Sequence, residues 1–298
     1  MKILLTGSEG QLGISVKDLK PKNIILIATN RKTLDLYDSK KCLETVLDLK
    51  PDWIINCGAY TNVDSSESKP DTAYKINSNA PEFFAKALKI TGGKLLQIST
   101  DYVFNGNQNT PYLNTQKKDP ISIYGKSKAL GEDKIVKELK NYHNYYILRT
   151  SWLMGPKGNN FASKIINLHS QQDFINIVSD QYGSPTSTNS LANIIWEIII
   201  QEENFNKLKQ GVNPILHWSD EGITSWYDLA IAIGDISLDL GLIKKKAKVF
   251  PIKSSSYKNS CLRPRYSKLD CEYTKQTLGL KGVYWRESLT SMLKMKLK

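Results

Sequence analysis

The sequence predicts an α/β protein with a doubly wound parallel sheet and a smaller α/β region at its C-terminal end. Short apolar segments alternate with helical segments over residues 1–152, a pattern typical of parallel strands joined by helices. A glycine-rich turn directly follows the first apolar segment. Beyond residue 152 the alternation becomes irregular. We therefore expect a sheet-based domain over 1–152, rejoined by part of 187–240, and a second region over 153–298.

The composition is that of a globular protein with a basic surface. Hydrophobic residues make up 40% and charged residues 23% of the 298 positions, which suffices for a sizeable core. The net charge of +12, from 41 basic and 29 acidic residues, favours anionic partners. The densest basic cluster, 244–248, contains no aromatic side chain on which a base would stack. We interpret it as a solvated face and predict no nucleic-acid partner.

The sequence also predicts a cytoplasmic protein without membrane contact. No apolar run approaches the roughly 20 residues that a membrane-spanning helix requires, and the first strand begins too early to leave room for a targeting segment. Four cysteines are scattered along the chain: Cys42, Cys57, Cys261 and Cys271. Because they form no Cys-x-x-Cys motif and have no paired histidines nearby, we expect reduced thiols.

The glycine-rich turn predicts a dinucleotide site. Lys2–Thr6 is predicted to be a short buried strand, Gly7–Gly13 follows it, and Ile14–Leu19 continues as a helix. Glycines here let backbone amides approach a pyrophosphate, and the helix N-terminus adds partial positive charge. The spacing is Gly-x-x-Gly-x-x-Gly, not the commoner Gly-x-Gly-x-x-Gly, but its position after the first strand favours a Rossmann-type fold.

The end of the second predicted strand, Ile24–Ala28, bears on the choice of cofactor. Dinucleotide-binding folds usually place an acidic residue there for the ribose hydroxyls. This chain has Asn30, followed by Arg31 and Lys32. A neutral amide beside two bases accommodates a 2′-phosphate, so the sequence favours NADPH, with NADH possible. The alternative is that both bases merely lie in an exposed turn.

Two further strand ends carry small or hydroxyl side chains. Trp53–Asn56 leads into residues 57–61, whose small side chains either leave space for a ligand or allow close packing. The predicted strand Lys94–Ile98 places Ser99 and Thr100 at its carboxyl end, where open parallel sheets bind ligands.

A tyrosine and a lysine follow on the next predicted helix. Asp119-Pro120 marks a helix start, and Tyr124 and Lys128 follow at i and i+4, which places a phenol and an ammonium on one helical face. A hydroxyl such as that of Thr100 beside this pair suits proton transfer to a carbonyl oxygen. The spacing alone is common in surface helices, and the agreement with the other motifs favours a catalytic site.

The remaining predicted elements continue the alternation, and we expect the second half to close over the carboxyl edge of the sheet and select the substrate. Helices are predicted at 39–49, 71–91, 160–170, 187–201, 225–240 and after 285, strands at 145–149, 174–178 and 215–218, and a polar turn at 180–186.

Six motifs occur in order along essentially the whole chain: Gly7–Gly13, Ser99–Phe104, Tyr124-x-x-x-Lys128, Arg149–Trp152, Asp180–Thr186 and Arg263-Pro264. With them the chain resembles the dTDP-4-dehydrorhamnose reductases of the extended short-chain dehydrogenase/reductase superfamily. The resemblance implies reduction of the C4 keto group of dTDP-4-dehydro-β-L-rhamnose with NADPH or NADH. The product would be dTDP-β-L-rhamnose for cell-surface polysaccharide.

The resemblance also implies a catalytic triad of Thr100, Tyr124 and Lys128. Tyr124 would protonate the C4 oxygen as hydride arrives, and Thr100 would polarise the carbonyl group. Lys128 would hold the nicotinamide ribose and lower the tyrosine pKa, which is about 10 in the free side chain, towards neutrality.

Binding residues are implied in the same way. The implied cofactor-binding residues are Gly7, Gly10, Gln11, Leu12, Asp35, Leu36, Ala59, Tyr60, Thr61, Tyr124 and Lys128. Those for the nucleotide-sugar are Thr100, Asp101, Val103 and Trp152. We add Arg263 as a hypothesis for the diphosphate, because a guanidinium suits paired phosphate oxygens.

Departures from the family pattern leave alternatives open. Asn30 replaces the ribose-binding acid of some relatives, so NADPH and NADH both stay open as the cofactor. Ser15 replaces a glutamate that forms a magnesium-bridged dimer in some relatives, so we predict no required metal and either a monomer or a homodimer.

Another nucleotide-sugar enzyme, an epimerase or a dehydratase, is the main alternative. Tyr102 after Asp101 disfavours a dehydratase, which generally has an acidic pair there. A non-catalytic subunit of the same fold is the second alternative.

Overall fold

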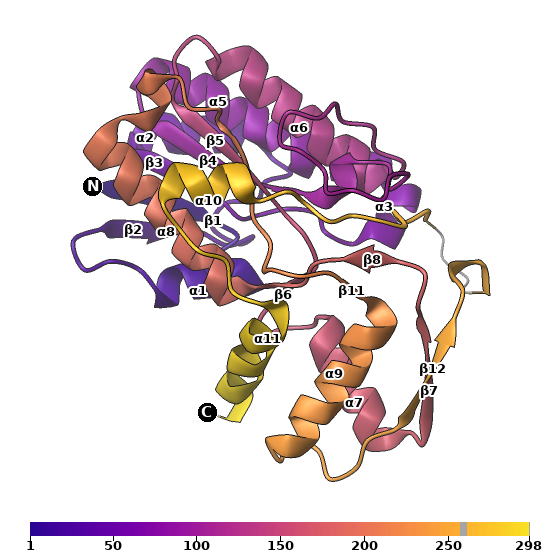
Figure 1. The fold of residues 1–298 in the computed structure, drawn as a ribbon. Coiled ribbons are helices and arrows are strands. Elements are labelled where there is room, and N and C mark those ends of the chain that lie inside the picture. Colours follow the sequence, from indigo (N-terminus) through magenta and orange to yellow (C-terminus); the bar gives the residue numbers. More distant parts are fainter. Residues whose placement is uncertain (257–260, 298) are drawn as a thin grey trace.

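The computed structural model describes residues 1–256 and 261–297, and a six-stranded parallel sheet lies at its centre (Figure 1). The strands lie side by side in the order β2-β1-β3-β4-β5-β10. Their bounds are β1 Lys2–Thr6, β2 Ile25–Ala28, β3 Trp53–Asn56, β4 Lys94–Thr100, β5 Tyr145–Thr150 and β10 Ile215–His217. The order reverses at β1, which has β2 on one side and β3 on the other. Ligands of such sheets bind outside the carboxyl ends at this switch point.

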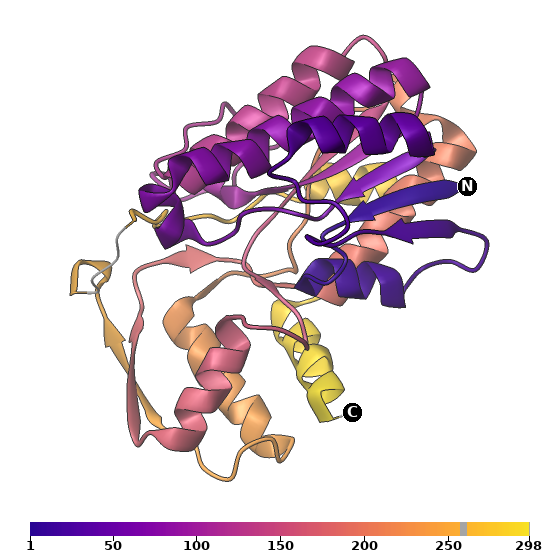
Figure 2. The ribbon, with the colours of Figure 1, turned by 180° about the vertical axis from the view of Figure 1, so that it is seen from behind.

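Helices cover both faces of the sheet, as the predicted doubly wound fold requires (Figure 2). The helices α1 (Gln11–Asp18) and α8 (Thr188–Phe205) pack on one face. The helices α2 (Ser39–Leu49), α5 (Ala80–Thr91) and α6 (Ile123–Leu139) pack on the other. The inner strands β1, β3 and β5 are therefore buried on both sides, which explains why they are largely apolar runs in the sequence.

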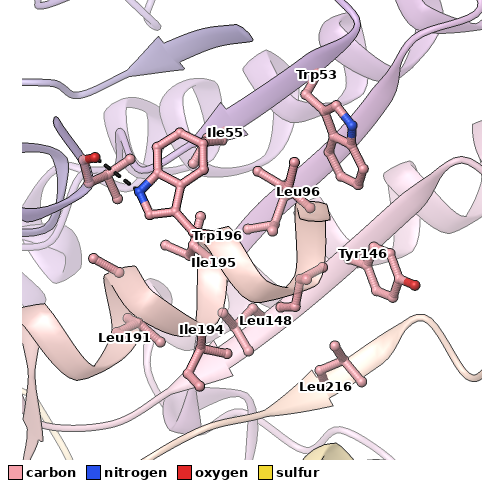
Figure 3. Close-up of a cluster of buried hydrophobic side chains, with 14 of the residues drawn as sticks. Trp53, Ile55, Leu96, Tyr146, Leu148, Leu191, Ile194, Ile195, Trp196 and Leu216 are labelled. Carbon is pink, nitrogen blue, oxygen red and sulfur yellow. Dashed lines mark hydrogen bonds between the residues drawn. The ribbon is translucent and has the colours of Figure 1, made fainter. Parts of the chain in front are cut away.

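The cluster between the sheet and α8 shows how the two halves of the chain interlock (Figure 3). Trp196 of α8 packs into the same buried cluster as Ile55 and Leu96 of the sheet. Its indole Nε1–H donates to the carbonyl oxygen of Val16 in α1 at 3.1 Å. This bond satisfies the one polar group of the indole, so the tryptophan fills the core without an unpaired donor.

A smaller α/β region lies beside the sheet and has its own apolar core around α7, α9 and α11 (Figure 1). Its elements are β6 Leu153–Met154, α7 Phe161–Gln171, β7 Phe174–Val178, β8 Tyr182–Gly183, β9 Thr186–Ser187, β11 Thr224–Ser225, α9 Trp226–Asp239, β12 Lys248–Ile252 and α11 Trp285–Lys294. Among the described residues, no helix is long and apolar enough to cross a bilayer.

The helix predicted over 71–91 is interrupted. It comprises α4 (Pro70–Tyr74), a π-helical turn (Lys75–Asn79) and α5. Pro81 has no N–H, and its ring would clash with the carbonyl group four residues earlier, that of Asn77, in a continuous α-helix. The wider π turn moves that carbonyl away from the proline.

Other predicted boundaries also differ. The predicted helix start at Asp119-Pro120 is wrong, because α6 begins at Ile123 after Ser122, whose hydroxyl accepts the N–H of Gly125 at 3.1 Å. The strand β12 and the short helices α3 (Val63–Ser68) and α10 (Glu272–Leu278) were not predicted. In β12 the strand signal is hidden by Pro251, which is tolerated because β12, within the described part of the chain, has β7 as its single partner strand.

Candidate active site

The carboxyl ends of the central strands open into a cleft of about 660 Å³. Its walls come from the glycine-rich turn, from the residues that follow β3, β4 and β5, and from Asn159 and Trp226 of the smaller region. The predicted site residues that line it are Gly7, Gly10, Gln11, Leu12, Ala59, Thr61, Thr100, Asp101, Tyr124, Lys128, Trp152 and Arg263. The fold thus brings most of the predicted residues to one place.

The glycine-rich turn is shaped by close backbone approaches. Gly7 has φ +64°, a left-handed conformation that favours glycine. A Cβ atom on Gly13 would lie 2.2 Å from the carbonyl oxygen of Gly7, so α1 can approach the turn only if position 13 is glycine. Gly10 is the N-cap of α1, and it lines the cleft together with Gln11 and Leu12 of the first turn, so the N-terminus of this helix would stabilise an anion there.

Three side chains meet at the ends of β4 and α6. The Lys128 Nζ atom donates to the carbonyl oxygen of Ile98 at 2.6 Å. Thr100 donates through Oγ1 to Asp101 Oδ1 at 3.0 Å and forms a hydrogen bond with the Tyr124 side chain. Because Lys128 reaches down to β4 while Tyr124 reaches Thr100, both lie on the face of α6 that covers the strand end.

Burial controls the protonation of this group. Loss of hydration raises the pKa of Tyr124 to about 12, although a hydrogen bond with Thr100 has the opposite, smaller effect and lowers it. Burial lowers the pKa of Lys128 to about 8, although the negative charge of Glu132 acts in the opposite direction and raises it. The predicted lowering of the Tyr124 pKa by Lys128 is wrong for this structure, because the cost of burying a phenolate dominates. A protonated phenol is nevertheless the form that donates a proton to a carbonyl oxygen.

Asp101 also responds to burial. Desolvation raises the pKa of its carboxyl group to about 6, although hydrogen bonds with Ser267 and Thr100 lower it. The side chain lines the cleft next to Thr100, so its charge changes in the pH range where an enzyme of this kind would operate.

The residues predicted to select the cofactor lie at the rim, outside the residues that line the cleft. Asn30 donates through Nδ2 to Glu9 Oε1 at 2.6 Å, and Glu9 itself lines the cleft. Arg31 is 85% exposed and pairs with Asp35 at 3.6 Å. Leu36 is buried, and its Cδ1 atom lies so close to Gly58 that any larger residue at position 58 would collide with it.

Two further residues that were predicted to bind ligands, Tyr60 and Val103, do not line the cleft. Tyr60 exchanges two backbone hydrogen bonds with the amide side chain of Asn77, at 2.8 and 3.0 Å, which fixes the segment after β3. Val103 is fully buried in an apolar cluster with Phe104 and Leu269, so its side chain does not reach the cleft.

A tryptophan that the sequence analysis missed completes the cleft. Trp226, the first residue of α9, stacks on Trp152 with ring centroids 3.5 Å apart and planes 6° apart. Trp152 has φ +45°, an unusual conformation for a bulky residue, which indicates that its surroundings hold it in place. No local motif in the sequence links these two positions, because the contact forms only when the smaller region, with α9, folds next to the end of β5.

Gln11 connects the glycine-rich turn with the smaller region. Its Oε1 atom accepts the backbone N–H of Gly155 at 3.0 Å and the side-chain amide of Asn160 at 2.7 Å. Asn160 is the N-cap of α7. Gln11, which the resemblance predicts to bind the cofactor, therefore also fixes the segment that places Asn159 at the cleft.

Comparison with known proteins agrees with this geometry. The RmlD substrate binding domain family matches residues 1–297. The spore coat polysaccharide biosynthesis protein SpsK of Bacillus subtilis (strain 168) is 36% identical over 98% of this chain and 96% of its own length. A crystal structure of a dTDP-4-dehydrorhamnose reductase from Clostridium acetobutylicum has a TM-score of 0.90, 36% identity and 100% coverage of both chains. A crystal structure of the dTDP-4-dehydrorhamnose reductase of Bacillus anthracis in complex with NADP has a TM-score of 0.88, 31% identity and 99% coverage of both chains.

The resemblance inferred from the motifs is thereby confirmed. The sheet order, the glycine-rich turn and the cleft occur in a chain that matches the family over nearly its whole length. The chain therefore belongs to the RmlD substrate binding domain family and is an NAD(P)-dependent oxidoreductase of that family of nucleotide-sugar reductases.

Proposed function

We propose that the protein reduces the C4 keto group of dTDP-4-dehydro-β-L-rhamnose to give dTDP-β-L-rhamnose, with NADPH as the preferred reductant. The observation that carries the proposal is the common cleft of the glycine-rich turn with Thr100, Tyr124 and Lys128. A dinucleotide on the turn would have its reactive end at the carboxyl edge of β4, beside the proton donor. The similarity to the dTDP-4-dehydrorhamnose reductases of Clostridium acetobutylicum and Bacillus anthracis supports a nucleotide-sugar substrate.

The residues of the cleft divide the reaction between them. Bound nicotinamide supplies hydride to C4. Tyr124 donates its phenolic proton to the C4 oxygen, and the Thr100 hydroxyl polarises that oxygen by a hydrogen bond. Lys128 orients the nicotinamide ribose and compensates negative charge on Tyr124 after proton transfer. Trp152 contacts the sugar, and the stacked Trp226 keeps its ring in one orientation.

The NADPH preference is tested at Arg31. We expect Arg31→Ala to raise the KM for NADPH about tenfold, the effect of losing a charge-assisted hydrogen bond at an exposed site, while the KM for NADH stays unchanged. Lys22→Ala, an exposed lysine in the segment before β2, is the matched control. Equal effects on both cofactors, or none, would show that Arg31 does not contact a 2′-phosphate.

Arg263 is proposed to bind the diphosphate. It lines the cleft, its Nη2 atom pairs with Asp64 at 2.9 Å, and its buried Nε–H has no hydrogen-bond partner among the described residues. We expect Arg263→Ala to raise the KM for the nucleotide-sugar by about 10- to 100-fold, as for loss of a charged hydrogen bond, with the Kd for NADPH unchanged. Arg286→Ala on α11 is the control, and loss of folding in the Arg263 variant would refute the assignment.

The proposal is tested by following NADPH oxidation with the keto sugar made in place from dTDP-glucose. Substrate-dependent oxidation supports it. Interconversion of C4 epimers without net oxidation would support the epimerase alternative, and dehydration would support the dehydratase. A folded protein that binds NADPH yet reduces nothing would support the non-catalytic alternative.

A further inference from the structure

A buried carboxylate lies directly behind the proposed catalytic pair. Glu132 is 1% exposed and follows Tyr124 and Lys128 on the same face of α6, at i+8 and i+4 respectively. Its Oε1 atom accepts the hydroxyl of Ser99 at 2.5 Å and the Nε–H of Arg149 at 3.0 Å. Its Oε2 atom accepts Arg149 Nη2 at 2.7 Å. A single side chain thus links α6 to two strands.

Both strands carry residues that line the cleft just beyond these contacts. Ser99 precedes Thr100 on β4, and Arg149 precedes Thr150 on β5. In the parallel register of β4 and β5, Ser99 lies opposite Arg149, and Thr100 lies opposite Thr150. The carboxylate of Glu132 is therefore the point at which the helix bearing Tyr124 is joined to the strand end bearing Thr100.

The surrounding charges keep this carboxylate ionised. Burial alone would raise the pKa of Glu132, but the charge and hydrogen bonds of Arg149, with Lys118 at 3.3 Å, lower it to about 2. Two titratable groups bear on Lys128 in turn, Glu132 from its own helix and Cys57 from the end of β3. Burial has the larger effect and lowers the pKa of Lys128, whereas the negative charges of Glu132 and Cys57 would raise it. Of these two groups only Glu132 is ionised at neutral pH, because burial raises the pKa of Cys57 to about 12.

We propose that Glu132 is a positioning residue for the reduction: it sets the distance between Tyr124 and Thr100 and supplies the fixed negative charge that matches Lys128. This rests on the proposed function of Tyr124 and Lys128. Glu132 itself does not line the cleft, so it acts through Ser99, Arg149 and Lys128 without touching substrate. A displacement of about 1 Å between reacting groups lowers rates about 100-fold.

A buried carboxylate with a purely structural role would behave differently, and the chain contains a matched example. Glu202 on α8 is also 1% exposed and accepts the hydroxyl of Tyr146 at 2.9 Å and the N–H of Leu208 at 3.0 Å. It lies away from the cleft-lining residues. Glu132→Gln and Glu202→Gln therefore remove the same charge from equally buried sites, and both are expected to lower Tm.

The test compares kcat and its pH profile in the two variants. We expect Glu132→Gln to lower kcat about 100-fold and to shift the alkaline limb of kcat to lower pH, because Lys128 loses the charge that opposes its deprotonation. Glu202→Gln is expected to keep the wild-type kcat and pH profile. A folded Glu132→Gln protein with both quantities unchanged, or equal losses in the two variants, would overturn the proposal.

Two additions keep the outcome decisive. If Glu132→Gln does not fold, Glu132→Gln/Arg149→Met removes both buried charges and is expected to show the same loss of kcat; wild-type kcat in that variant would overturn the proposal. If the wild type reduces no keto sugar, the pH dependence of NADPH binding still reports on Lys128. As the pH is raised, NADPH binding should begin to weaken at a lower pH in Glu132→Gln than in the wild type. Identical pH profiles would exclude the role of Glu132 independently of the substrate.

Discussion

Replacing Tyr124 by phenylalanine is expected to lower kcat for keto-sugar reduction by about 10²- to 10⁴-fold, the usual contribution of a general acid. Loss of hydration raises the pKa of this phenol to about 12, which keeps it protonated at neutral pH. It forms a hydrogen bond with Thr100 at the end of β4, where a substrate carbonyl would receive hydride. Phenylalanine keeps the ring and its packing but has no proton to give.

The control for this change is Tyr146→Phe. Tyr146 is another buried tyrosine, and its hydroxyl donates to Glu202 at 2.9 Å, away from the cleft. Loss of that bond is expected to cost about 1 kcal/mol of unfolding free energy without changing kcat. Steady-state rates and thermal unfolding of both variants separate the two effects. A Tyr124→Phe enzyme with nearly wild-type kcat would show that the proton comes from another group.

Gly125→Ala is also expected to lower kcat strongly. A Cβ atom at position 125 would lie 2.2 Å from the backbone carbonyl oxygen of Tyr102, in the turn that follows Thr100. Because this oxygen belongs to the main chain, α6 must move away from the strand end, and Tyr124 moves with it. We expect kcat to fall about 100-fold, as for a misplacement of about 1 Å.

Gly234→Ala is the matched control, since Gly234 also lies inside a helix, α9, and its Cβ atom would meet the ring of His169. That change is expected to lower Tm and leave kcat unchanged. Equal kcat values for Gly125→Ala and the wild type would show that the close approach of α6 to Tyr102 is not required for catalysis.

Much of the fold was predictable because local patterns determine it. The strands that form the sheet are apolar runs bounded by turn residues, and Gly7–Gly13 directly follows the first of them. The positions of Thr100, Tyr124 and Lys128 follow from a strand end and from helical spacing, and the structure places these residues in one cleft. Their roles stay predictions until variants are measured.

The remainder depends on contacts between distant segments. The stacking of Trp226 on Trp152 and the bonds of Gln11 to Gly155 and Asn160 join segments that no local pattern connects. The raised pKa of Tyr124 was also not predicted, because the sequence indicates a neighbouring lysine but not how far the phenol is removed from water.

The most direct test of the central claim is transfer of deuterium from NADPH in which both hydrogens at nicotinamide C4 are deuterium. The enzyme would act on dTDP-4-dehydro-β-L-rhamnose, and the product would be examined by mass spectrometry and NMR. We predict dTDP-β-L-rhamnose with one deuterium at C4 of the sugar, formed at least about 100-fold more slowly by Tyr124→Phe. Unlabelled product, deuterium at another carbon, or no reduction by a folded protein that binds NADPH would contradict the account.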